Sequence, residues 1–403
     1  MTSTSPDTIV DRRYDLDWIR VGAFFLLILY HVGMFYVPWD WHVKSPHPVE
    51  ALEPVMMLTN PWRLTLLFLV SGAATRFMAD KVTVGHLTGA RVARLLPPLL
   101  FAMFVIVPPQ SYYQVVEYAA AHPGWSGSVD GFWLKYATAS GHWCTPDGCL
   151  ITPTWNHMWF VAYLLVYTLV LAGLLAMFRR LGERLQAGAE RALSGVGLIL
   201  WPVAFLAATR IFLFPRFDVT HALVDDWYNH AVSLAAFLLG FGLAKSDALR
   251  RRLIAARWPS LILALAAYAG WATYAWIYRG EAVPPAALRN VMRVVYSLDQ
   301  WCAITAILGF GALHLNRSSP ALRYLTLGVF PFYIVHQTLI VVAAHYLAKL
   351  GLPQGLEAAI LIAGTFAGCF ATYEIVRRIP GVRLLFGLKG QSAAVASRPP
   401  AFA

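Results

Sequence analysis

The chain has 403 residues, of which 58% are hydrophobic and only 13% are charged. Soluble domains contain about a quarter charged residues, so this composition excludes a soluble globular protein. The formal net charge of +11 would indicate a nucleic-acid partner in a soluble protein, but here the positions of the basic residues give another reason for it.

Apolar runs long enough to cross a bilayer follow one another along the whole chain. They lie at about 17–37, 55–75, 95–117, 155–178, 193–214, 229–245, 258–278, 289–313, 321–346 and 354–376. The first run is too long to be a cleavable signal peptide. The sequence therefore predicts an all-α polytopic bundle of about ten transmembrane helices.

Basic residues gather in alternate connections between these runs. If the N-terminus is cytoplasmic, 23 of the 32 Lys and Arg fall on the cytoplasmic side, which predicts that both termini are cytoplasmic. The expected organisation is a cytoplasmic segment over 1–16, a ten-helix transmembrane domain over 17–378, and a cytoplasmic tail over 379–403. We expect this tail, which is rich in Ala and Pro after Gly390, to lack regular structure.

The longest predicted outer loop, at about 118–154, contains Cys144 and Cys149. Their spacing across a Pro-Asp-Gly turn favours a small disulfide loop in an oxidising compartment. A metal site is the alternative, but two thiols without further ligands at suitable spacing make a weak case for it. We therefore expect no metal ion.

The first helix carries Arg20 near its cytoplasmic end and His31 beyond its middle. Eleven residues span about 16 Å and close to three turns, so both side chains point to the same side of the helix. Charges inside a span are costly, which makes this pair a candidate for anion binding and proton transfer. Alternatively, Arg20 reaches the lipid headgroups and His31 hydrogen-bonds a neighbouring carbonyl.

Arg91 and Arg94 lie one turn apart at the cytoplasmic entrance to the third run. Two guanidinium groups on one face can bind phosphate bidentately. Alternatively, they only follow the excess of basic residues on the cytoplasmic side.

Four further polar residues inside apolar segments are second-rank candidates. His157 opens the fourth run at its outer end, and His336 lies near the middle of the ninth. A buried structural histidine is the more common reading of each one alone. Arg293 and Asp299 in the eighth run are expected to form an internal ion pair or to contact substrate.

Together these motifs resemble the type 3 membrane acyltransferase family. The resemblance rests on Arg-x10-His in the first helix, Arg-x-x-Arg at the third, His-x-Trp-Phe at the fourth and Phe-Tyr-x-x-His-Gln at the ninth. It covers the chain from Tyr14 to about Arg378 and is strongest to members that modify periplasmic glucans. The family fold is a ten-helix bundle, in agreement with the count of apolar runs.

The resemblance implies an acyltransferase of class EC 2.3.1 in the bacterial inner membrane. Its members move acetyl or succinyl groups from cytoplasmic acyl-CoA to sugars on the outer face, with acyl-CoA as co-substrate and no resident cofactor. Residue by residue, His31 matches the catalytic histidine, Arg91 and Arg94 match the donor-binding arginines, and Arg20 matches the arginine of the first-helix motif.

Two chemical routes remain open at this point. His31 either takes a proton from the acceptor hydroxyl or forms an acyl-histidine. We expect His157 to contact the acceptor sugar, and Trp155, Trp159 and Trp143 to suit stacking on a pyranose ring. The alternative function is a proton-coupled transporter, although no inverted repeat is visible. The acyl group, the acceptor and the oligomeric state cannot be read from the sequence.

Overall fold

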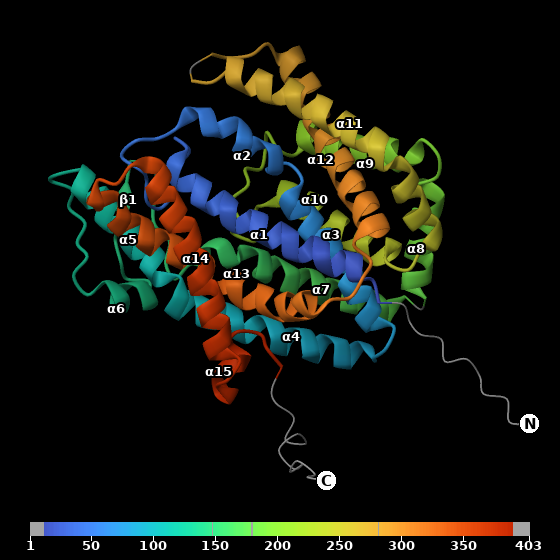
Figure 1. Cartoon of the computed structure of the whole chain (residues 1–403), viewed down its shortest axis with the longest axis horizontal. Coiled ribbons are helices and arrows are strands. Elements are labelled where there is room, and N and C mark those ends of the chain that lie inside the picture. The colour runs from blue at the N-terminus through green and yellow to red at the C-terminus, as the bar shows by residue number, and fades with distance from the viewer. Residues whose placement is uncertain (1–11, 147, 179, 281, 390–403) are drawn as a thin grey trace, which may run out of the picture.

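The computed structural model describes residues 12–146, 148–178, 180–280 and 282–389. The expectations for the first eleven residues and for 390–403 lie outside the described residues. Within the described residues the protein is helical, apart from one two-stranded hairpin. The all-α architecture is therefore confirmed (Figure 1).

The longer helices occur in chain order as α1 (Tyr14–Tyr36), α3 (Arg63–Ala79), α4 (Val84–Phe101), α5 (Pro108–Ala121), α7 (Trp159–Met177), α8 (Leu181–Ala192), α9 (Gly197–Phe212), α10 (Trp227–Leu243), α11 (Asp247–Ile277), α12 (Ala286–His314), α13 (Pro320–Leu347) and α14 (Gln354–Val376). The shorter elements are η1 (Glu50–Leu52), α2 (Glu53–Thr59), the π-helical η2 (Ala102–Ile106), α6 (Phe132–Ala137), β1 (Cys144–Thr145), β2 (Gly148–Cys149), η3 (Asn156–Met158), η4 (Ala348–Leu350) and α15 (Pro380–Leu385).

Each of the ten predicted apolar runs overlaps a helix of the structure. Seven helical segments of the described chain are long and apolar enough to cross a membrane, and the α8–α9 pair, bent by 103°, would make an eighth. The helices α3 and α10, which overlap two further predicted runs, are shorter, with 17 residues each. The count of ten spans and the cytoplasmic location of both termini stay predictions.

The third predicted run is longer than expected, because helix continues from Val84 to Ala121. Pro97 and Pro98 lack an N–H group, so they leave carbonyls of the preceding turn without their helical partners. The π-turn η2 follows directly, and there the N–H of Val107 bonds to the carbonyl of Ala102 at 2.8 Å. This continuous segment carries Arg91 and Arg94 at one end and α5 at the other.

Helix α1 occupies the centre of the bundle and contacts α3, α12, α13 and α14 (Figure 1). Two glycines explain the close approach of α3 and α10. A Cβ on Gly72 would lie 1.8 Å from the carbonyl oxygen of Phe237, and one on Gly240 would lie 1.8 Å from that of Leu69. Only glycine at both positions lets these backbones approach so closely.

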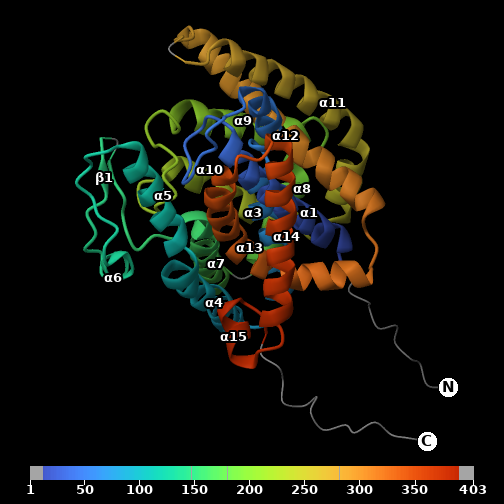
Figure 2. The ribbon, with the colours of Figure 1, turned by 60° about the vertical axis from the view of Figure 1, so that its left-hand side comes forward.

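The outer-loop region forms a small separate cluster at one end of the bundle, where α5, α6 and β1 lie together in both ribbon views (Figures 1 and 2). Its core consists of Val115, Phe132, Tyr136 and Trp143. Cys144 and Cys149 are joined by a disulfide at the base of the β1–β2 hairpin.

The tail departs from expectation near its start. Residues 380–385 form α15, which begins at Pro380 and contacts α4 and α14. Proline is favoured in the first turn of a helix because its missing N–H has no helical partner there. The expectation of an unstructured tail is therefore wrong for this stretch.

Candidate active site

His31 and His336 contact each other in the interior of the bundle. His31 Nδ1 on α1 lies 2.8 Å from His336 Nε2 on α13, and the two rings are nearly parallel. His336 is fully buried, whereas His31 is half-buried. The structure therefore brings together the leading sequence candidate and a second-rank one, 305 residues apart.

The hydrogen-bond partners fix which nitrogen of each ring carries the proton. His336 Nδ1 lies 2.7 Å from the carbonyl oxygen of Tyr333, so it must donate, and Nε2 must accept. His31 Nδ1 is therefore the donor to His336. In the described part of the chain His31 Nε2 has no hydrogen-bond partner, so its lone pair is not engaged by the protein.

A second hydrogen-bonded group of amides and imidazoles begins at Gln337, the residue after His336. Gln337 Nε2 contacts His42 Nε2 at 2.9 Å and Gln110 Oε1 at 3.1 Å. His42 Nδ1 lies 2.7 Å from Gln114 Oε1. The amide nitrogen must donate to His42 Nε2, so Nδ1 carries the proton of that ring. Burial lowers the pKa of His42, which favours the same neutral form.

His157 lies deeper than the sequence suggested. The residue is 6% exposed. Its Nε2 lies 3.0 Å from the carbonyl oxygen of Ile334, and its Nδ1 lies 3.3 Å from Gln110 Nε2. The hydroxyl of Tyr333 also donates to the backbone carbonyl of His157. Both ring nitrogens are thus occupied, and His157 is not in position to contact an acceptor without rearrangement.

On the predicted cytoplasmic side of the histidines, at the Arg20 end of α1, lies a cationic cavity of about 650 Å³. Arg20, Arg91 and Arg94 all line it, so the three arginines singled out in the sequence share one site. Lys81, His86 and Lys389 add further basic groups, and no carboxylate is among its described lining residues. We call it the inner cavity. Its walls include Phe24, Phe160 and Tyr333. Tyr333 lies about one helical turn before His336 on α13.

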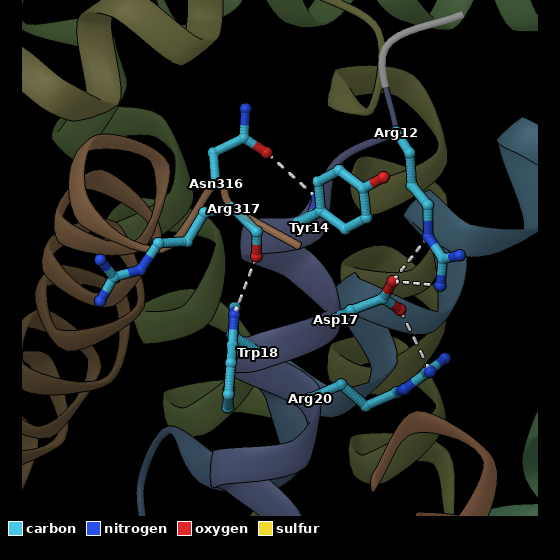
Figure 3. Close-up of polar contacts among 7 residues, drawn as sticks. All are labelled: Arg12, Tyr14, Asp17, Trp18, Arg20, Asn316 and Arg317. Atoms are coloured by element: carbon cyan, nitrogen blue, oxygen red, sulfur yellow. Dashed lines mark hydrogen bonds and ion pairs between the residues drawn. The ribbon is translucent and has the colours of Figure 1, made fainter. Parts of the chain in front are cut away.

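Two of these arginines keep donors free. Arg20 Nη2 contacts Asp17 Oδ1 at 3.2 Å, and the other oxygen of Asp17 contacts Arg12 (Figure 3). Arg91 Nη2 donates to Thr75 Oγ1 at 2.7 Å. The Nε atoms of Arg20 and Arg91 are buried without a partner in the described structure. Such donors favour an anionic ligand.

On the opposite side, which the predicted topology places outside, lies a second cavity of about 870 Å³, here called the outer cavity. Four tryptophans line it, together with His42 of the histidine network; they are Trp41, Trp125, Trp143 and Trp155. Trp159 does not line the outer cavity, but it stacks on the ring of His221, which does, with centroids 4.0 Å apart. Of the predicted stacking residues, Trp143 and Trp155 therefore face this space and Trp159 lies behind it.

A buried cation that the sequence analysis did not single out lies over Tyr30, the residue that precedes His31. Arg63, at the start of α3, is 2% exposed, and its guanidinium lies 3.7 Å above the ring of Tyr30. It donates to Thr59 Oγ1 at 3.1 Å, and its Nε has no partner. The Tyr30 and His31 rings are 6.1 Å apart. No carboxylate of the described residues forms an ion pair with Arg63.

Arg293 and Asp299 are not part of this arrangement. Arg293 donates to Asn290 at 2.9 Å, whereas Asp299 accepts from Trp271 Nε1 at 2.8 Å. Neither residue lines the inner or the outer cavity. The expectation of an ion pair between them is wrong, because residues six apart on a helix lie on different faces. The described residues hold no group of His, Cys, Asp and Glu arranged for a metal ion.

Sequence reasoning missed His42, Gln110, Gln337 and Arg63. Of these four, Gln337 was the easiest to find from the sequence, because it directly follows His336 in the quoted motif. His42 lies in a loop without periodicity, and Gln110 follows a Pro-Pro pair that marks only a helix start.

Comparison with known proteins assigns this architecture to a class. Residues 13–374 match a family model described as "Acyltransferase domain". The chain belongs to the type 3 acyltransferase family and is a membrane acyltransferase.

Among curated proteins, it is similar to glucans biosynthesis protein C of Salmonella typhi and of Salmonella typhimurium. Each is 25% identical over 400 residues, covering 94% of this chain and 95% of the relative. The same protein of Salmonella schwarzengrund is 24% identical over the same shares. No solved structure matches the chain.

Proposed function

We propose that this protein transfers an acyl group from cytoplasmic acyl-CoA to a hydroxyl group of an extracytoplasmic glycan or glucan. One observation carries the proposal: the His31–His336 pair contacts residues of both the cationic inner cavity and the tryptophan-lined outer cavity, since His336 donates to Tyr333 and the ring of His31 stacks on that of Trp41. An enzyme that joins an anionic donor on one side to a sugar on the other needs this arrangement.

The inner cavity suits the donor. The phosphates of coenzyme A cannot enter hydrocarbon cheaply, so the head must stay at the inner surface while the thin pantetheine arm reaches inward. Arg20, Arg91 and Arg94 would hold the phosphates. The arm would pass Phe24 and Tyr333 and bring the thioester to His31.

The outer cavity suits a sugar. Tryptophan faces stack on the apolar face of a pyranose ring, and four of them line this space. The relatives named glucans biosynthesis protein C agree with a glucan acceptor. In this arrangement His42 and the tryptophans, rather than His157, would contact the acceptor.

His31 would act as the general base through Nε2. It takes the proton of the acceptor hydroxyl as that oxygen attacks the thioester carbonyl. The carbon–sulfur bond then breaks, and the leaving thiolate takes the proton back from His31. We favour this direct transfer over an acyl-histidine, because neutral His31 can accept the hydroxyl proton in a single transfer step that needs no covalent intermediate. The charge of Arg63 would stabilise the oxyanion between the two steps.

The acyl group is acetyl or succinyl in this proposal. A succinyl group would need a cation for its free carboxylate. Arg293, which the sequence predicts to contact substrate or Asp299, lies outside both cavities. Arg63 also lies outside them, but its guanidinium lies over Tyr30, the residue before His31.

The test is turnover by the purified protein in lipid nanodiscs with labelled acetyl-CoA or succinyl-CoA and a glucan acceptor. We expect transfer of label to the glucan, loss of turnover by about 10²–10⁴-fold in His31→Ala, and normal turnover in His314→Ala, which removes an exposed histidine of α12. Absence of thioester consumption with either donor would overturn the proposal. A covalent acyl-protein trapped without acceptor would overturn direct transfer.

A further inference from the structure

A second basic cavity, of about 510 Å³, adjoins the inner cavity. The two share Arg94 and the turn that follows α15, residues 387–389. The second cavity adds three more arginines from the end of α14 and from α15; they are Arg377, Arg378 and Arg383. We call it the C-terminal cavity.

The charges of this cavity are only partly balanced. Glu374 pairs with Arg377 at 3.0 Å and with Arg378 at 2.7 Å. Arg383 instead donates to two backbone carbonyls, from Nε to Lys389 at 2.9 Å and from Nη1 to Arg377 at 2.5 Å. Neither Arg383 nor Arg94 has a carboxylate partner among the described residues. The carbonyls hold Arg383 in place without neutralising it, so it keeps its charge for a ligand.

Between the two cavities, the turn that follows α15 packs closely against α4 and α13. Gly387 has a φ of +66°, and a Cβ there would lie 2.3 Å from the ring of Phe330 and 3.2 Å from the carbonyl oxygen of Arg94. Only glycine allows the chain to turn here and to rest on α4 and α13. The N–H of Leu388 closes the turn on the carbonyl of Arg383 at 2.9 Å. Arg94 therefore lies at the junction of the two cavities, with access to both.

We infer that the C-terminal cavity binds the ribose 3′-phosphate of the donor, with Arg383 as its principal ligand. This inference rests on the proposed function. Coenzyme A carries two separate anionic groups, a diphosphate on the pantetheine side and a phosphomonoester on the ribose. Two adjoining cationic cavities bridged by Arg94 match two such groups on one molecule, and a guanidinium can bind a phosphomonoester bidentately.

The experiment compares binding of coenzyme A and of 3′-dephospho-coenzyme A to the full chain in lipid nanodiscs. Coenzyme A is the common product of every acyl-CoA donor, so the measurement does not depend on the acyl group. We expect removal of the 3′-phosphate to weaken binding about tenfold or more in the wild type. Equal affinity for the two ligands would overturn the inference while leaving the proposed function intact. Failure of coenzyme A itself to bind would overturn both.

Two variants separate phosphate binding from a structural role of Arg383. Arg383→Gln should bind both ligands with the weak affinity of the dephospho form, and Arg383→Lys should recover part of the difference. If Arg383 only held the turn, Arg383→Gln would weaken both ligands by the same factor and keep the ratio, which would contradict the assignment. Arg317→Gln removes an exposed charge near the start of α1, outside both cavities, and should change neither affinity (Figure 3).

Discussion

The ring of His336 lies between the backbone of α13 and His31, with Nδ1 2.7 Å from the carbonyl oxygen of Tyr333 and Nε2 2.8 Å from His31 Nδ1. Because His336 Nδ1 donates to the carbonyl, His336 Nε2 must accept from His31 Nδ1. This leaves Nε2 of His31 unprotonated. His336→Ala should therefore lower kcat by about tenfold or more, with little change in the KM for acyl-CoA. Steady-state kinetics in nanodiscs with the donor varied at saturating glucan measure both constants.

The control for this variant is coenzyme A binding, which should stay normal because His336 does not line the inner cavity. A variant that retains full kcat would show that the tautomer of His31 does not depend on its neighbour.

Arg91 and Arg94 should act on the donor alone. Arg91→Ala and Arg94→Ala are each expected to raise the KM for acyl-CoA about tenfold, since each removes a charged hydrogen-bond donor from the inner cavity. The KM for the glucan should not change. Arg323→Ala removes an exposed cation of α13 outside this cavity and serves as the matched control. Normal coenzyme A binding in both variants would contradict the assignment of phosphate contacts.

Arg63 should affect the reaction rate more than substrate binding. It is buried beside Tyr30 and has no carboxylate partner among the described residues, so its charge can act on an oxyanion that exists only during transfer. Arg63→Gln should lower kcat by about 10²-fold and leave the affinity for coenzyme A unchanged. Thermal unfolding of the variant checks that loss of the Thr59 and Tyr30 contacts has not unfolded the protein. A large rise in the donor KM with normal kcat would indicate a ground-state contact instead.

Trp155 should contribute to acceptor binding. Trp155→Ala is expected to raise the KM for the glucan about threefold to tenfold, which is the usual effect of losing one aromatic face, and to leave donor binding unchanged. Trp258→Ala, at an exposed position of α11 away from the outer cavity, provides the comparison. If acceptor kinetics were identical in the two variants, the outer cavity would not be the glucan site.

His42 should make the folded protein less stable at low pH. Burial lowers the pKa of His42 below the value of about 6.5 that it has in an unfolded chain. Below about pH 6.5 the unfolded chain binds the proton more readily than the folded protein, so the free energy of unfolding falls as the pH falls. Protonation of Nε2 would also remove the acceptor of Gln337.

The measurement is the thermal unfolding midpoint in detergent at pH 7.5 and pH 5.5. His42→Gln cannot titrate and should lose less between the two values than the wild type. His122→Gln, at an exposed histidine, is the matched control. An equal loss in wild type and His42→Gln would show that His42 does not sense the pH.

Local patterns were sufficient for the features that a single helix defines. Apolar runs located a helix at each of the ten predicted positions, and the three-residue spacing of Arg91 and Arg94 put both on one cavity. The eleven-residue spacing on α1 correctly separated Arg20, in the inner cavity, from His31, at the network. These features follow from helical periodicity, which can be read directly from the sequence.

Features that depend on packing between distant helices were not accessible. The contact of His31 with His336 joins α1 to α13, and no spacing along the chain encodes it. Arg63 reads as an ordinary helix-end cation until α3 brings it over Tyr30. Asp299 appeared to need a cation, because its real partner, Trp271, is on the neighbouring helix α11.

The hydrogen bonds around the histidines also bear on proton leakage through the protein. A relay that conducts protons needs groups that both accept and release a proton at every step. Here the N–H groups of His336 and His157 end on the backbone carbonyls of Tyr333 and Ile334, which cannot pass a proton on. An acyl group would then cross the bilayer between two cavities without opening a conducting path beside it, and the proton-motive force would be preserved during each turnover.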